Sequence, residues 1–144
     1  MISPDTIKLL RECDAGIKMG MSSIDEVLPY VQADDMKRIL EECRAEHDDI
    51  QTEINKLLDK YHDQGKEPNP VVQGMAQMKT SAKLIMNESD KTIASLMTDG
   101  SNMGVKSLSK YLNQYKDADA KAKDITKRLV ELEEKLAKNM QQFL

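Results

Sequence analysis

The feature that most constrains the fold of this chain is the spacing of its apolar residues, which recur every three or four positions over long stretches. The last segment shows this spacing in the series Tyr115, Ala118, Ala122, Ile125, Leu129, Leu132, Leu136, Met140 and Phe143. An earlier segment repeats it in the series Met36, Leu40, Cys43, His47, Ile50, Ile54, Leu57 and Tyr61. This period gathers apolar side chains on one face of a helix, and that face must be buried against other helices. The spacing therefore predicts an all-α protein.

The ends of the helices are predicted from capping residues and helix breakers. Ser3-Pro4-Asp5 is typical of a helix start, because serine caps a helix and proline suits its first position. Pro29 is expected to bend or stop the first helix, and Gly100 and Gly104 suggest a close helix contact or a local kink. The same reasoning gives helices at about 4–30, 34–62, 70–86, 90–113 and 117–142.

The lengths of the connections predict how these helices are arranged. The first two helices and the last two are joined by short connections, so each pair is expected to be antiparallel. The stretch from about 63 to 89 is long enough to travel back along the bundle. This predicts one domain over 1–144, a ferritin-like four-helix bundle with the short helix 70–86 as its crossover. A five-helix up-and-down bundle is the structural alternative.

Composition excludes several classes of function. The 144 residues are 40% hydrophobic and 32% charged, with a net charge of −4 and both signs interleaved, so no basic stripe is present for nucleic acid. No long apolar run predicts a membrane span, and no signal-peptide pattern is present at the N-terminus, so a cytoplasmic protein is expected. Cys13 and Cys43 form no metal motif and are expected to be small buried side chains in a reducing compartment.

Two hydrophilic residues, Asp14 and His47, fall on otherwise apolar stripes. In a ferritin-like bundle His47 lies at the level of about Lys18, and the third long helix brings a polar segment near the same level. Buried polar groups need hydrogen-bond partners. We therefore expect a polar pocket in the middle of the bundle, built from Asp14, His47, Asp99, Ser101 and Asn102.

Several short segments resemble the small bacterial ferritin-like domain proteins, some of which are involved in or near stress responses. The resemblance covers nearly the whole chain and rests on Leu9-Leu10…Gly16, Arg44-Ala45-Glu46-His47, Gly65-Lys66-Glu67-Pro68, Met78-Lys79, and Asp90…Ile93 leading into Gly100. It implies a ferritin-like four-helix bundle and no particular activity.

The metal chemistry of ferritin-like proteins can be tested against the residues. Their di-metal site takes a Glu from each of two helices and a Glu-x-x-His from each of the other two. Here the residue three before His47 is Arg44, and the last helix contains no histidine. We therefore expect no metal site, no cofactor and no catalytic residues.

Two hypotheses for the function remain. The favoured one is a non-enzymatic ferritin-like bundle with a degenerate metal site, acting as a structural or interaction module. It leaves a protein partner or self-association open, with Met75 and Met78 of the crossover helix offering an adaptable surface. The rival is an enzyme or metal-handling protein, with an atypical site built from Glu12, Asp14, Glu46, His47 and Asp99.

Overall fold

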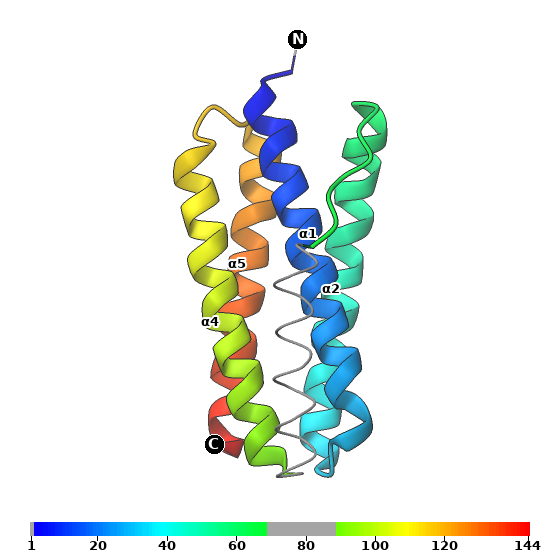
Figure 1. Ribbon diagram of the computed structural model, residues 1–144, viewed down its shortest axis with the longest axis vertical. Helices are drawn as coiled ribbons and strands as arrows, with labels where there is room; N and C mark the ends of the chain where they lie inside the picture. Colours follow the sequence, from blue (N-terminus) through cyan, green and yellow to red (C-terminus); the bar gives the residue numbers. More distant parts are fainter. Residues whose placement is uncertain (1, 69–88) are drawn as a thin grey trace.

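The computed structural model describes residues 2–68 and 89–144 and contains long helices throughout (Figure 1). These are α1 (Pro4–Val27), α2 (Asp34–Lys60), α4 (Asp90–Gln114) and α5 (Ala120–Met140), with short 3-10 turns η1 (Leu28–Tyr30) and η2 (Gln141–Phe143). No strand occurs in the two described ranges, so the prediction of an all-α protein is confirmed for them. The predicted helix 70–86, on which the two proposed topologies differ, lies outside the described residues.

Side-chain caps explain where three of the helices begin. The Ser3 hydroxyl accepts the Asp5 backbone N–H at 3.2 Å, and the Ser89 hydroxyl accepts the Thr92 N–H at 3.1 Å. Asp119 caps α5 by accepting the Ala122 N–H at 2.9 Å. The last helix therefore starts at Ala120 and not near 117, because the capping carboxylate satisfies an N–H that would otherwise lack a partner.

The first helix ends earlier than expected, and the turn that follows it is bound by a carboxylate from α4. The α-helix stops at Val27 and continues only as the 3-10 turn that contains Pro29, whose ring nitrogen has no hydrogen to donate. Ala33, the N-cap residue of α2, has no side-chain oxygen and makes no side-chain cap, and the turn that precedes α2 is held instead by Asp90 of α4. Its two carboxylate oxygens accept the N–H groups of Gln32 and Ala33, each at 2.9 Å.

These contacts between helix ends fix the directions of the four helices. The start of α4 lies against the turn between α1 and α2, so α2 and α4 leave from the same end of the bundle and run parallel (Figure 1). At the other end, Thr6 Oγ1 accepts the Asp119 N–H at 2.8 Å and Asp5 accepts the Asp117 N–H at 3.1 Å. The start of α1 is thereby joined to the turn between α4 and α5, and the result is a four-helix bundle over the described residues.

The core of the bundle is aliphatic. Its largest fully buried side chains are Leu9, Leu10, Ile17, Ile24, Met36, Leu40, Ile54, Ile93, Ile125, Leu129 and Met140. Met103 of α4 is an apolar side chain outside this core and is 63% exposed. The buried face of α4 continues from Met97 through Ser101 to Leu108, and Met103 lies off that line.

Candidate functional site

The most unusual buried group in the bundle is the imidazole of His47, at the centre of α2. The side chain is 1% exposed. Its Nδ1 lies 2.8 Å from the backbone carbonyl oxygen of Cys43, one turn earlier in the same helix, and 3.6 Å from the Cys43 sulfur. Its Nε2 lies 2.8 Å from Oε1 of Glu133, which the neighbouring helix α5 presents. Both ring nitrogens are therefore engaged by neighbouring groups.

The partners of His47 determine its charge. A carbonyl oxygen and a carboxylate oxygen only accept hydrogen bonds, so each ring nitrogen must carry a proton and the ring is an imidazolium. Burial lowers the pKa of His47, but the Cys43 and Glu133 side chains raise it by more, and the pKa reaches about 10. At neutral pH, His47 and Glu133 thus form an ion pair inside the bundle.

Two glycines lie against this ion pair, and one of them is needed to make room for it. A Cβ atom added to Gly20 of α1 would lie 2.9 Å from His47 Nε2, closer than real contacts allow. A Cβ on Gly104 of α4 would lie 3.4 Å from Cγ and Cδ of Glu133, an ordinary contact. Each of the four helices therefore contributes one residue, and we call the set of His47, Glu133, Gly20 and Gly104 the His47–Glu133 centre.

The chemistry open to this centre is limited. An imidazolium with both N–H groups donated has no lone pair to accept a proton or to bind a metal ion. Within 2–68 and 89–144, no group of three or more His, Cys, Asp or Glu side chains is arranged to hold a metal ion. The centre is therefore suited to joining α2 and α5 and is poorly suited to acid–base catalysis.

The second polar stripe residue, Asp14, has a different role. It is 1% exposed, and its Oδ2 accepts the backbone N–H of Lys66 at 3.0 Å and the Lys18 ammonium at 2.9 Å. Its Oδ1 has no hydrogen-bond partner among the described residues. Asp14 therefore anchors the segment that follows α2, which descends beside α1 in Figure 1.

We call residues 63–67 of this segment the strap, because ion pairs hold it to α1 along its length. Arg11 pairs with Asp63, Glu12 with Lys66, and Lys18 with Glu67. Gly65 adopts a φ of 79°, and a Cβ there would collide with the Asp14 carboxylate. Glycine is thus required at the closest approach of the strap to α1.

The five residues predicted to share a pocket are distributed as follows. Asp14, His47 and Ser101 are buried, whereas Asp99 and Asn102 are exposed on α4. The Ser101 hydroxyl has no hydrogen-bond partner in the described part of the chain. Asp14 bonds to Lys18 and the strap, and His47 bonds to Cys43 and Glu133, so the structure gives these two residues separate partners.

The residues of the rival metal site are also held apart by their own partners. Glu12 pairs with Lys66 at 2.6 Å, and Glu46 pairs with Lys135 at 3.1 Å. Sequence reasoning missed Glu133, because it lies beside the apolar stripe of α5 and follows Leu132 within a run of acidic residues. The glycines at 20 and 104 are the signal that could have pointed to it, since they mark where neighbouring helices leave space.

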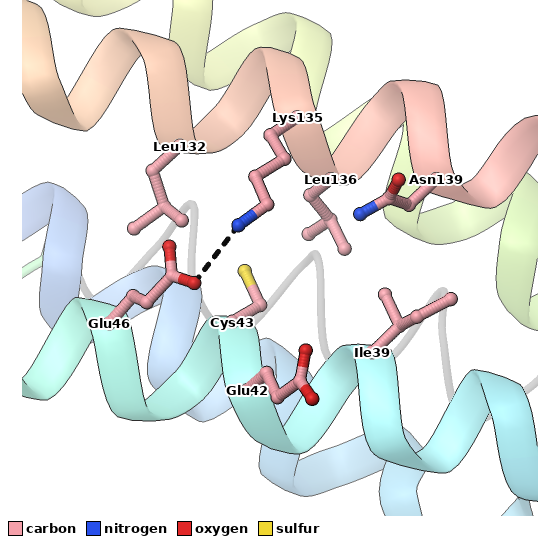
Figure 2. A pocket seen from close by; sticks show the side chains of 8 residues that line it. All are labelled: Ile39, Glu42, Cys43, Glu46, Leu132, Lys135, Leu136 and Asn139. Atoms are coloured by element: carbon pink, nitrogen blue, oxygen red, sulfur yellow. Dashed lines mark hydrogen bonds and ion pairs between the residues drawn. The ribbon is translucent and has the colours of Figure 1, made fainter.

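A surface groove runs between α2 and α5, outside the His47–Glu133 centre. Its wider part has a volume of about 350 Å³ and is floored by Ile50 and Leu132. A narrower part of about 20 Å³ continues along the helices over Cys43 and Leu136. Figure 2 shows this narrower part, where Glu46 and Lys135 reach toward each other from the two helices.

Comparison with known proteins gives information about the fold alone. No protein-family model matches the chain, and no curated protein matches it. The chain is similar in structure to a DUF305 fragment from Deinococcus radiodurans, known from a crystal structure, with a TM-score of 0.77. The match covers 98% of this chain and 95% of that chain at 12% sequence identity. The TM-score supports a shared helical-bundle fold. An identity this low carries no function from one chain to the other.

Within 2–68 and 89–144, no helix is long and apolar enough to cross a bilayer.

Proposed function

We propose that this chain is a non-enzymatic protein with a ferritin-like four-helix bundle, in which an ion pair stands where related folds hold metal. We further propose that it acts as a structural or interaction module. The position of the His47–Glu133 centre supports the comparison with di-metal bundles. The centre takes one residue from each of the four described helices and lies at the middle of α2. Di-metal bundles build their site from inward carboxylates and histidines on the same four helices.

The observation that carries this proposal is the pairing of His47. Its Nδ1 donates to the Cys43 carbonyl and its Nε2 to Glu133, each at 2.8 Å. A metal-binding histidine must be neutral and must direct one nitrogen lone pair at the metal. The residues that α1 and α4 bring against this pair are Gly20 and Gly104, which have no side chain that could bind a metal ion.

The same residues argue against the metal-handling alternative. Glu12, Asp14 and Glu46 are each paired with a lysine of their own, and Asp99 is exposed. A metal ion would have to break several ion pairs and bring these side chains together from different levels of the bundle. No contact among the described residues favours that rearrangement.

The proposal is tested by metal titration of the purified chain with Fe²⁺, Mn²⁺ and Zn²⁺, followed by desalting and elemental analysis. We expect far less than one ion per chain, and the same result for a His47→Ala variant. Binding of one or two ions per chain that disappears in His47→Ala would contradict the proposal and restore the metal-handling alternative. Far-UV circular dichroism of both proteins shows whether the variant is folded.

A further inference from the structure

We propose that the groove between α2 and α5 binds a basic amphipathic helix of a partner protein. This inference rests on the proposed role as an interaction module and names the surface and the class of partner. The groove lies on the outer side of the two helices, away from the strap on α1, and its lining comes only from α2 and α5.

The shape of the groove fits a helix better than a small molecule. It follows two antiparallel helices from Ile39 to Glu53 along α2, roughly 20 Å at about 1.5 Å per residue. Small-molecule sites enclose most of the ligand surface, whereas this groove is open along its length. A third helix lying between two packed helices inserts its apolar side chains into such a groove.

The floor of the groove is apolar and slightly open to solvent. Cys43, Ile50, Leu132 and Leu136 belong to the bundle core, yet each keeps between 5% and 8% of its surface exposed here. Ile39 is partly buried beside them. A partner that covers this floor with aliphatic side chains removes the remaining apolar surface from water.

The walls of the groove carry the charge that defines the partner. Five carboxylates line it against two cationic groups. Glu46 pairs with Lys135 at 3.1 Å, and Glu53 pairs with Arg128 at 2.8 Å, so two carboxylates are already neutralised across the groove. The other three, Glu42, Asp49 and Glu131, make no hydrogen bond or close ion pair within the described residues, and Glu42 also feels the charge of Lys135 at longer range.

The three open carboxylates lie on both sides of the apolar floor. Glu42 and Asp49 are two helical turns apart on α2, and Glu131 lies opposite on α5. A complementary helix therefore carries lysine or arginine on both flanks of its apolar stripe. Nucleic acid would be repelled by this surface, and the net charge of −4 makes a second copy of the chain a less favourable occupant than a basic partner.

The test uses a synthetic helical peptide of about 16 residues, enough to span the groove. It has leucine at helical spacing and lysine on both flanks of the leucine stripe. Calorimetric titration is expected to give one peptide per chain, with affinity that weakens as salt is added. A peptide with glutamate in place of lysine and a scrambled lysine peptide of the same composition are both expected not to bind.

Two variants of equal charge locate the binding surface. Glu42→Gln with Asp49→Asn removes the open carboxylates of the groove on α2. Glu41→Gln with Asp48→Asn removes the same charge from exposed residues one position earlier, which do not line the groove. We expect the first double variant to weaken binding about tenfold and the second to leave the dissociation constant within about twofold.

Several results would overturn the inference. The scrambled peptide could bind as tightly as the amphipathic one, or both double variants could weaken binding equally. Either result would mean that the peptide responds only to the overall negative charge of the protein. Sedimentation that finds a dimer lost in Glu42→Gln with Asp49→Asn would assign the groove to a second copy. Failure of the peptide to bind removes the docking proposal but leaves the metal titration to decide the proposed function separately.

Discussion

At the scale of single residues, the bundle is distinguished by a cation and an anion that are taken out of water together. His47 is 1% exposed and the Glu133 side chain 12% exposed, with 2.8 Å between Nε2 and Oε1. Such a pair adds little net stability compared with well-packed apolar residues, but removing one member leaves the other charge buried without a partner. The two residues are therefore interdependent, which an apolar stripe alone does not reveal.

The first prediction follows from this interdependence. The stripe pattern by itself predicts that His47→Leu is neutral or stabilising, but Glu133 reverses the expectation. We expect His47→Leu to lower the free energy of unfolding by roughly 3 kcal/mol, and His47→Leu with Glu133→Leu to recover most of the loss. Chemical denaturation measures both, with exposed Glu134→Leu as the control. A single variant as stable as the wild type would show that the ion pair is not formed.

The second prediction concerns pH. Because the folded-state pKa of His47 is raised to about 10 from its ordinary value of 6.5, its stabilising contribution is fully present below about pH 6.5. The contribution is lost as pH rises toward 10, by up to about 1.4 kcal/mol per pH unit. The stability difference between wild type and His47→Gln should therefore shrink between pH 7 and 10. A difference that grows over this range would have the wrong sign.

At the scale of elements, single glycines on α1 differ in how closely a neighbouring side chain approaches them. On α1, Gly20 faces His47, whereas a Cβ on Gly16 would meet nothing within 4 Å. We expect Gly16→Ala to raise the free energy of unfolding by up to about 1 kcal/mol, the usual gain in a helix interior. Gly20→Ala should lower it, because the imidazole is held by two hydrogen bonds and cannot move aside. Thermal and chemical unfolding compare the two, and equal effects would contradict the close approach.

The strap gives the second element-scale prediction and a contrast between two residues that the sequence analysis grouped together. Asp14→Ala removes the acceptor of the Lys66 N–H and the partner of Lys18, and should cost about 1–3 kcal/mol. Asp99→Ala, on the exposed face of α4, should change stability by no more than about 0.5 kcal/mol. Amide hydrogen exchange at residues 63–67 should accelerate in Asp14→Ala, and unchanged exchange would show that the strap is held by its other ion pairs alone.

The spacing of apolar residues predicted the four long helices that the structure describes and placed His47 and Asp14 inward, because the helical period decides which side chains share the buried face. It did not predict their partners. Glu133 reaches the core with a long side chain from beside the stripe, and Lys66 meets Asp14 through a backbone N–H. Such contacts depend on the relative rotation and height of the helices, which the pattern of any one helix does not contain.

At the scale of the whole molecule, the fold is set by stripes and caps and tolerates great change in sequence. The DUF305 fragment from Deinococcus radiodurans has the same overall shape, with a TM-score of 0.77 at 12% identity. An aliphatic core needs only residues of suitable size at the right period. Within the described residues, His47 and Asp14 are hydrophilic side chains that interrupt the apolar stripes, and each is held by its own polar partners.

The central claim is that His47 is a fully engaged imidazolium. Nitrogen-15 NMR of the ring tests it most directly, in a His62→Gln variant that leaves His47 as the sole histidine. We predict that both ring nitrogens show imidazolium chemical shifts from pH 6 to about pH 9, unchanged by added Zn²⁺ or Fe²⁺. A ring that becomes neutral near its ordinary pKa of 6.5, or whose nitrogen signals shift when metal is added, would contradict the account.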